Sequence, residues 1–291
     1  MKSSSRFPSL EDIEHYERNG YVTSPRIIPD ELIEEALYGV HRYYAGERDW
    51  QLPISGGFLD WRAEQGAGLR INDYVSLQNP ELRKLVTSCE LGQAFASLMR
   101  AETVRLFHDQ LIGKPPDSSD KTAIGWHVDA AYWRTCTSIR MMTAWIPLVE
   151  YAIDMGPLMV IPGSHRWQGN ERMATFNTRD LGSLEAQMES ASGSIERVPI
   201  LIRPGQVSFH HARMVHGSMP NRGKNERIAL TVHVQDGDNR YQRFVDCRDM
   251  VAVHVNDALC RRDRDGQPDY TDPDICPVLW NCAREAAPTA E

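Results

Sequence analysis

The first hundred residues carry the spacing of amphipathic helices. Apolar positions recur every three or four residues in 10–19 and again in 31–44, which is the period of a helix that packs one face on a core. Ser9 is a predicted N-cap with an acidic residue three positions later, and Gly20 stands where the first helix is expected to end. Residues 80–100 are expected to form one or two further helices.

The pattern changes at Thr103, after which short β-rich runs follow one another between Gly, Pro, Asn and Asp. Short strands at regular spacing, separated by turn residues, predict a sandwich or a barrel. A long polar insertion, 165–195, interrupts them and is expected to hold a helix near 181–190. The predicted strands are 103–112, 124–132, 138–149, 157–161, 197–202, 206–216 and 226–235.

The fold class expected from this order is mainly β with flanking helices. No repeat of fixed period and no low-complexity linker divides the 291 residues, so one domain is predicted. It comprises an N-terminal helical layer (1–102), a β core (103–240) and an irregular C-terminal tail (241–291). Residues 45–80 are rich in Gly, Trp and turn formers, and they are a candidate lid over an active site.

Composition narrows the set of partners. The net charge is −8 and no long basic run occurs, so nucleic acid is not an expected partner. The longest apolar stretch, around 141–149, is far too short to span a bilayer, so no membrane is expected either. We expect a small-molecule substrate and a monomer or a homodimer.

The cysteines and the N-terminus bear on localisation. Six cysteines occur without a C-x-x-C pair, which indicates neither a zinc site nor a redox motif. Residues 1–10 are polar and lack the apolar centre of a signal peptide. These features predict a cytoplasmic protein with free thiols, in which C-terminal cysteines would pair only in an oxidising compartment.

Candidate chemistry begins at Trp126-His127-Val128-Asp129-Ala130. Residues two apart in a strand point to the same face, so His127 and Asp129 are expected to project side by side. An imidazole nitrogen and a carboxylate oxygen are two ligands for a first-row divalent metal, and a second His would complete the 2-His-1-carboxylate triad of iron(II) oxygenases. The His-x-Asp tripeptide alone is weak evidence because it arises often by chance.

A second histidine stands in Val215-His216-Gly217-Ser218. The turn formers of 220–223 and a β-rich run from Arg227 follow, which is typical of a hairpin. In a hairpin, His216 and Arg227 would face one cavity from adjacent strands, and the Arg would hold a carboxylate by two parallel hydrogen bonds. That suits the distal carboxylate of 2-oxoglutarate. His165 competes for the place of third metal ligand but lies in a predicted turn.

With these motifs the sequence resembles the phytanoyl-CoA dioxygenase family of iron(II)- and 2-oxoglutarate-dependent oxygenases. The resemblance covers residues 103–235, and the N-terminal helical segment fits it too. It implies a double-stranded β-helix, the jelly roll of cupin-like proteins, with helices packed outside. The matching segments are F-H-D-Q-L-I-G-K-P-P, G-W-H-V-D-A-A-Y-W, T-A-W-I-P-L, G-P-L-M-V-I-P-G-S-H-R-W and V-H-G-S-M-P-N-R.

The resemblance also implies a site and a reaction. Its iron(II) ligands fall on His127, Asp129 and His216, and its 2-oxoglutarate contacts fall on Arg227, Ser218 and Trp145. The implied reaction with O2 is hydroxylation of an unactivated C–H bond of a small metabolite, with secondary metabolism as one setting. The carboxylate ligand favours hydroxylation over halogenation, in which Gly or Ala replaces that ligand.

Further residues near these motifs are candidates for substrate contact. Tyr132, Trp133 and Arg134 follow the His-x-Asp strand, where the cavity mouth is expected, although a solvated position is favoured for the Arg. His210 precedes the second His on the same predicted strand, and a structural role is favoured for it. Trp61 belongs to the candidate lid. Gln110 shares a strand face with His108 and is expected to contact 2-oxoglutarate or substrate, or to pack structurally.

Two other interpretations remain open. The same centre would also support desaturation, epimerisation or cyclisation. A cupin-like metal hydrolase or isomerase, or an inactive binding module, belongs to a different class, and neither needs a buried Arg227 aimed at a dicarboxylate. Residues 263–269 faintly resemble a calcium loop but lack the bidentate Glu of an EF-hand, so a solvated acidic turn is expected there.

Overall fold

The computed structural model describes residues 7–117 and 119–282. Residues 1–6 and 283–291 lie outside the described residues. The predictions of no signal peptide at 1–10 and of an irregular tail at 241–291 therefore fall partly outside them. The helices are α1 (Leu10–Asn19), α2 (Asp30–Tyr44), α3 (Pro80–Val86), α4 (Cys89–Met99), α5 (Leu181–Ser192) and α6 (Asn256–Leu259), and a 3-10 turn, η3, spans Asp129–Ala131. None of the described helices is long and apolar enough to cross a membrane.

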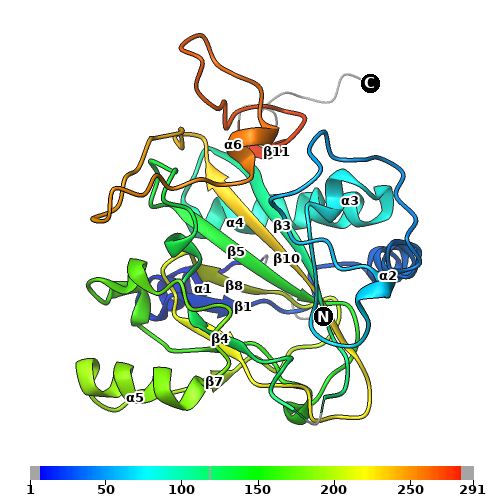
Figure 1. The fold of residues 1–291 in the computed structure, drawn as a ribbon, viewed down its shortest axis with the longest axis vertical. Coiled ribbons are helices and arrows are strands. Elements are labelled where there is room, and N and C mark those ends of the chain that lie inside the picture. Colours follow the sequence, from blue (N-terminus) through cyan, green and yellow to red (C-terminus); the bar gives the residue numbers. More distant parts are fainter. Residues whose placement is uncertain (1–6, 118, 283–291) are drawn as a thin grey trace.

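Two antiparallel sheets form the centre of the molecule (Figure 1). One sheet contains β1 (Tyr21–Thr23), β2 (Arg70–Asp73), β3 (Thr103–Lys114), β5 (Met141–Pro147), β8 (Ser208–His211), β10 (Arg227–Asp236) and β11 (Val278–Asn281), and the other contains β4 (Ile124–His127), β6 (Met159–Val160), β7 (Val198–Pro199) and β9 (His216–Ser218). The larger sheet runs β1-β8-β5-β10-β3-β11, with β2 also on β3, and the smaller runs β4-β9-β6-β7. The predicted jelly roll with flanking helices is confirmed.

The N-terminal helices form where the sequence signals predicted them. The Ser9 side chain accepts a hydrogen bond from the backbone of Asp12, whose carboxylate accepts from the Ser9 backbone, so the capping box closes. Gly20 ends α1 at a φ of 81°, a left-handed conformation that favours glycine. The predicted helix at 31–44 begins one residue earlier, at Asp30.

Alternation along the strands divides the larger sheet into an outer and an inner face. Apolar residues such as Leu106, Ala144 and Val232 belong to one buried core together with apolar side chains of α1 to α4. Their strand neighbours, such as Trp145 and Thr231, point the other way, because successive side chains alternate across a sheet. The helical layer therefore covers the outer face, and the inner face is left for the site.

The predicted hairpin between His216 and Arg227 is wrong. Strand β9 pairs with β4 and β6 in the smaller sheet, whereas β10 pairs with β3 and β5 in the larger one. The chain changes sheets between Ser218 and Arg227, and the Asn221 side chain ties this crossing to the end of β3 by donating to the Lys114 carbonyl.

The single strand predicted at 206–216 is also two strands in different sheets. Strand β8 ends at His211 and β9 begins at His216, with the Met214 N–H bonded to the His211 carbonyl in the turn between them. His210 therefore lies on the larger sheet and His216 on the smaller one. The two histidines approach from opposite walls, with ring centroids 4.5 Å apart, instead of from one strand.

The C-terminal residues return to the β core. Strand β11 pairs with the first residues of β3, and His254 stacks on Phe107 with ring centroids 4.5 Å apart. The acidic run 263–269 is a turn in which the Asp263 carboxylate accepts from two backbone N–H groups. All six cysteines are free.

Candidate metal centre

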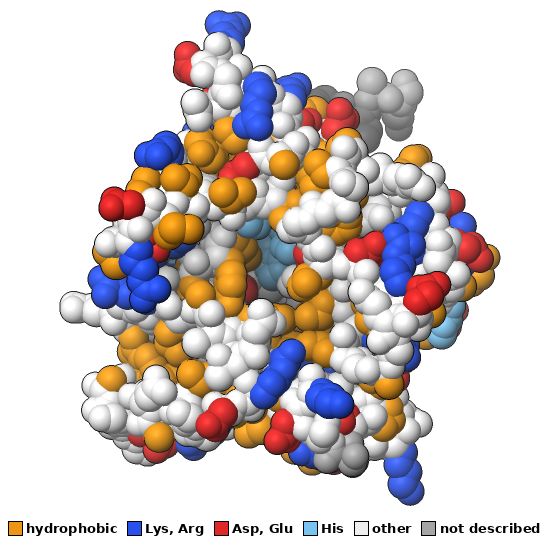
Figure 2. All heavy atoms as spheres, viewed as in Figure 1, with side chains coloured by type: hydrophobic (Ala, Val, Ile, Leu, Met, Phe, Trp, Pro, Cys, Tyr) orange, Lys and Arg blue, Asp and Glu red, His pale blue; other side chains and the backbone are white. Residues whose placement is uncertain are grey.

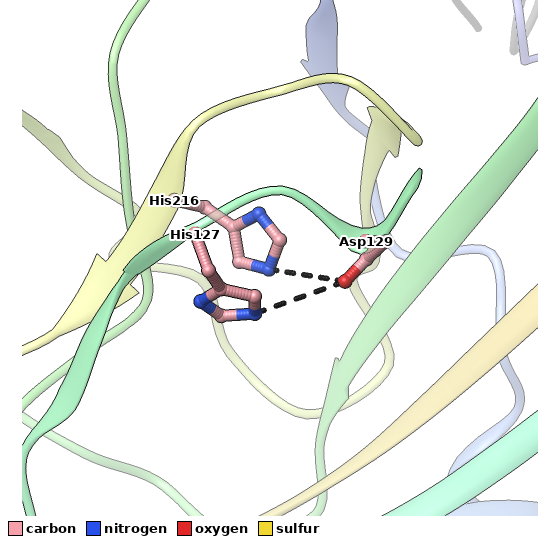
Figure 3. Close-up of side chains that lie close together, drawn as sticks. All are labelled: His127, Asp129 and His216. Carbon is pink, nitrogen blue, oxygen red and sulfur yellow. Dashed lines mark ion pairs between the residues drawn. The ribbon is translucent and has the colours of Figure 1, made fainter. Parts of the chain in front are cut away.

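The three predicted metal ligands meet between the two sheets (Figure 3). His127 and His216 are register partners at the paired ends of β4 and β9. Asp129 comes from η3, because β4 ends at His127 and not beyond Asp129 as expected. Val128 keeps an extended backbone, with φ −123° and ψ 140°, so the alternation continues and Asp129 still projects beside His127.

The donor atoms of these side chains fit a divalent metal ion. The Nε2 atoms of His127 and His216 lie 3.8 and 3.5 Å from Asp129 Oδ1, and one ligand atom from each residue lies within 4.8 Å of the others. Each Nδ1 bonds a backbone carbonyl, at 2.7 Å to Gly125 and 2.9 Å to Met214. These bonds fix the tautomer in which both Nε2 lone pairs face the carboxylate, as metal-binding histidines require.

The protonation states suit metal binding as well. Burial lowers the pKa of His127 and takes that of His216 well below its usual value, so both rings are neutral. Burial alone would raise the pKa of Asp129, but the surrounding histidines hold it well below its usual range. A neutral pair of imidazoles with one carboxylate is the form that coordinates a divalent cation.

The second carboxylate oxygen of Asp129 is held by the larger sheet. Thr143 Oγ1 donates to Asp129 Oδ2 at 2.6 Å and lies 2.8 Å from His233 Nδ1. Thr143, His210 and His233 are register partners on β5, β8 and β10. These residues form a polar row under Asp129, and His108 extends the row on β3.

A narrow cavity leads from the triad to Arg227, between Trp145, Leu158 and Ser218. Arg227 is 1% exposed; one guanidinium nitrogen donates to the Gly156 carbonyl at 2.7 Å, and its Nε has no partner. Its Cζ lies 5.5 Å from the centre of the Trp145 ring. Burial lowers the pKa of Arg227 to about 10, which leaves it charged at neutral pH.

Lys114 is a second buried basic residue at this end of the cavity, and the sequence did not single it out. It is the register partner of Arg227 across β3 and β10, and its Nζ donates to Ser218 Oγ at 2.6 Å and to the Met219 carbonyl at 2.7 Å. Burial takes its pKa well below the usual value. Among the described residues, no carboxylate forms an ion pair with Arg227 or Lys114.

A separate cavity of about 220 Å³ opens beside His127 and Asp129. Figure 2 shows a hollow on this face of the molecule with histidine side chains at its floor. Tyr132, Trp133 and Gln110 line this cavity. Gln110 lines the cosubstrate-side cavity too.

Two other candidates lie away from this cavity. Trp61 packs edge-on against Tyr44 and under Arg70, and Arg134 lies over the Phe244 ring and lines a neighbouring cavity. His210 lines the narrow cavity and is buried 3.5 Å from Asp129 Oδ2, and neither of its ring nitrogens has a hydrogen-bond partner.

His165 does not join the triad. Its Nε2 lies 3.3 Å from the Glu17 carbonyl and its ring lies 5.6 Å from that of His211. By contrast, the sequence analysis missed Asp73, His233, His254 and Phe176 in the wall of the larger cavity. They come from four segments far apart in the chain. Only His233 could have been found from the sequence, because it occupies an inward-pointing position of a predicted strand.

A family profile described as phytanoyl-CoA dioxygenase (PhyH) matches residues 16–229, which is most of the chain. The chain belongs to the phytanoyl-CoA dioxygenase family. The peroxisomal phytanoyl-CoA dioxygenase of Bos taurus is 24% identical to it over 247 residues, covering 80% of this chain and 70% of the relative. A probable alpha-ketoglutarate-dependent hypophosphite dioxygenase of Stutzerimonas stutzeri is 26% identical over 165 residues, covering 54% and 55%.

Solved structures of similar fold include biosynthetic enzymes. The alpha-ketoglutarate-dependent carbocyclase SnoK from nogalamycin biosynthesis superposes with a TM-score of 0.70 at 23% identity, covering 94% of this chain and 96% of its own. EctD from S. alaskensis, solved with 2-oxoglutarate and 5-hydroxyectoine, superposes with a TM-score of 0.65 at 21% identity, covering 84% and 81%. The predicted membership of the phytanoyl-CoA dioxygenase family is thus confirmed, and these structures share its fold.

Proposed function

We propose that this phytanoyl-CoA dioxygenase family member is an iron(II)- and 2-oxoglutarate-dependent oxygenase with iron held by His127, Asp129 and His216. The observation that carries the proposal is Arg227, a buried guanidinium with an unpartnered Nε at the far end of a cavity that begins at the triad. The donor set of the triad fits iron(II), and the buried cation fits the distal carboxylate of 2-oxoglutarate.

The buried charge of Arg227 supports placing the distal carboxylate of 2-oxoglutarate at this end of the cavity. A buried cation without an opposite charge is costly, and among the described residues no carboxylate pairs with Arg227, whose register partner is the basic residue Lys114. A dicarboxylate cosubstrate would offset that cost on binding. Ser218, which Lys114 holds, and Trp145, which lies over the Arg, are the proposed further contacts.

Each side chain has a defined task in the reaction. Iron(II) with 2-oxoglutarate and O2 supplies the oxidising power that cleaves a substrate C–H bond, with succinate and CO2 as the coproducts. Gly125 and Met214 orient the ligating imidazoles, and Thr143 restrains the free oxygen of Asp129. Trp145 and Leu158 exclude water from the cosubstrate end. The protein thus positions the reacting groups and excludes water from the cosubstrate end.

We propose hydroxylation of a small metabolite as the outcome, and a role in secondary metabolism. A second candidate is cyclisation, epimerisation or desaturation at the same centre, and the structural likeness to the carbocyclase SnoK and the epimerase SnoN favours the first two. A metal hydrolase or an inactive binding module would not account for the buried Arg227. A cytoplasmic location remains our expectation, supported by the six free thiols.

An anaerobic titration with iron(II) and then 2-oxoglutarate tests the proposal. We expect the weak visible charge-transfer band of the chelate in the wild type and in His165→Ala, but not in His216→Ala. Wild-type protein without a band would refute the function. A band in His216→Ala with none in His165→Ala would refute the ligand assignment.

A further inference from the structure

The larger cavity beside the metal centre has no cationic side chain in its wall. It measures about 220 Å³, and its lining includes His127 and Asp129 but no Lys or Arg. Arg227 and Ser218 line the other cavity. The proposed 2-oxoglutarate carboxylate therefore has its counter-ion on the far side of the triad, which leaves the larger cavity for the substrate.

Asp73 is the carboxylate of this cavity that the metal centre does not use. It ends β2, is 5% exposed and lines the cavity. Gln110 Nε2 donates to its Oδ1 at 2.8 Å, the Leu59 N–H donates to its Oδ2 at 2.7 Å, and His108 Nε2 lies 3.3 Å from Oδ1. Burial would raise its pKa, but His108 and these hydrogen bonds lower it, so Asp73 is ionised at neutral pH.

Histidines complete the wall next to Asp73. His108 stacks on His233 with ring centroids 5.3 Å apart, and His254 meets His108 edge-on at 5.8 Å. Burial takes the pKa of His254 well below its usual value. That ring is thus a neutral hydrogen-bonding group, and it adds no positive charge that would attract an anion.

Aromatic side chains form the mouth of the cavity, and contacts with the cavity wall hold them in position. The Tyr132 hydroxyl accepts from the Phe176 N–H at 3.1 Å, and the Phe176 ring packs edge-on against His127 at 4.9 Å. Trp133 packs against His233 at 5.1 Å. A volume of about 220 Å³ falls below the roughly 300 Å³ at which pockets for drug-sized ligands begin, so a compact molecule fits it.

We propose that Asp73, backed by His108, anchors the substrate, and that this cavity takes a compact hydroxyl- or amine-bearing metabolite with no anionic group at the end that enters. The proposal rests on the function proposed above. A hydroxyl or ammonium donor would bond the Asp73 carboxylate, with His233 and His254 serving the remaining polar groups. A carboxylate or a phosphate at the entering end would bring negative charge towards Asp73 without a counter-ion, and an acyl chain would offer Asp73 no donor.

Three probes that share a three-carbon shape but differ in charge, together with one acyl-CoA, test this selection. Calorimetric titrations of 3-amino-1,2-propanediol, glycerol, glycerate and octanoyl-CoA would be made into the anaerobic complex with iron(II) and 2-oxoglutarate. We expect the aminodiol to bind at least about tenfold more tightly than glycerate, because a charge-assisted hydrogen bond replaces a repulsion. Octanoyl-CoA should bind no better than glycerate, because its acyl chain has no donor for the Asp73 carboxylate.

Two variants locate the effect. Asp73→Asn should lose the preference for the aminodiol and keep the charge-transfer band of the metal complex. Asp238→Asn removes the same charge from an exposed position and should keep the preference. If its melting curve shows Asp73→Asn to be unfolded, the order of the probes on the wild type decides.

Several results would overturn the proposal. They are tighter binding of glycerate or octanoyl-CoA than of the aminodiol, no binding of the aminodiol up to its solubility limit, or a preference that persists in folded Asp73→Asn. The band is recorded before each titration. Its absence from the wild type would refute the proposed function, whereas a normal band with the wrong probe order would refute only the substrate class.

Discussion

At the scale of single residues, Thr143 decides which oxygen of Asp129 is available to a metal ion. Its hydroxyl bonds Oδ2 at 2.6 Å, and this leaves Oδ1 facing the two histidines. Partners of this kind orient metal ligands, and removing them typically weakens metal binding by about 10- to 100-fold. We expect Thr143→Val to lose affinity for iron(II) in that range, measured by anaerobic titration.

Thr143→Ser is the matched control, because it keeps the hydroxyl and loses only a methyl group. It should retain most of the iron affinity. Equal iron affinities for Thr143→Val and the wild type, with both folded, would show that the carboxylate is oriented without this bond.

Arg227 is the residue on which the cosubstrate assignment depends. Removing one partner of a buried, hydrogen-bonded charge pair costs about 2–5 kcal/mol. We therefore expect Arg227→Gln to raise the dissociation constant of 2-oxoglutarate by at least about 30-fold, read from the charge-transfer band, while iron binding stays close to that of the wild type.

Arg197→Gln serves as the control for Arg227→Gln. Arg197 is partly exposed and pairs with Glu185 and Glu189 on α5. Its replacement should leave 2-oxoglutarate binding unchanged. A similar loss in both variants would point to a general effect of charge instead of a contact at the cosubstrate end.

At the scale of elements, the returning C-terminal strand is fitted closely against α4. A Cβ added at Gly92 would lie 2.3 Å from the Leu279 carbonyl oxygen of β11, a contact that requires the backbone to move. Strain of this kind typically costs about 1–3 kcal/mol. We expect Gly92→Ala to lower the free energy of unfolding by that amount in urea titrations.

Gly182→Ala gives the opposite result if this reasoning holds. Gly182 also lies in a helix, α5, but an added Cβ there meets nothing closer than 3.8 Å. Alanine reduces the freedom of the unfolded chain, so this variant should be neutral or up to about 1 kcal/mol more stable. Equal effects of the two substitutions would mean that β11 is not docked against α4.

At the scale of the whole molecule, buried histidines make the stability depend on pH. Burial lowers the pKa of His211 to about 4 and that of His233 to about 3, and it also lowers the pKa of His254. The unfolded chain therefore binds more protons below its histidine pKa of about 6.5. The stability that the folded protein gains from keeping these histidines neutral is complete above about pH 6.5 and is lost as the pH falls below it.

We expect the metal-free protein to lose about 1 kcal/mol of unfolding free energy per pH unit for each such histidine between roughly pH 6 and 4. Urea titrations at several pH values measure the slope. His211→Asn removes one titrating group and should flatten it by the share of one proton. A slope equal to that of the wild type would show that His211 is protonated in the folded state.

The sequence was sufficient for local structure. The capping box at Ser9 and the left-handed Gly20 depend on neighbours along the chain, and so does the spacing that brings His127 and Asp129 together. Short polar signals of this kind act over a few residues. They predicted the helices and the His-x-Asp pair, even though Asp129 lies just beyond the end of β4.

The sequence did not predict which of the two sheets each strand joins. The crossing after Ser218 carries turn residues that a hairpin would also use, whereas residues 212–215 after His211 carry no Gly, Pro, Asn or Asp at all. In both places the choice of sheet depends on which faces are buried in the assembled core. For that reason His216 and Arg227 were expected on adjacent strands, although they face each other from different sheets. They still line one cavity, because both occupy inward-pointing positions of their strands whichever sheet the strand joins.

The sequence by itself determined the family and the helical layer over a β core, and it pointed to the three residues that we propose as metal ligands, because each depends on short motifs. The tertiary structure alone brought Lys114 opposite Arg227 and placed Asp73, His233 and His254 in one cavity wall. These residues come from strands and a returning C-terminal segment that are distant in the chain. Their shared burial follows from packing two sheets face to face, which no local pattern encodes.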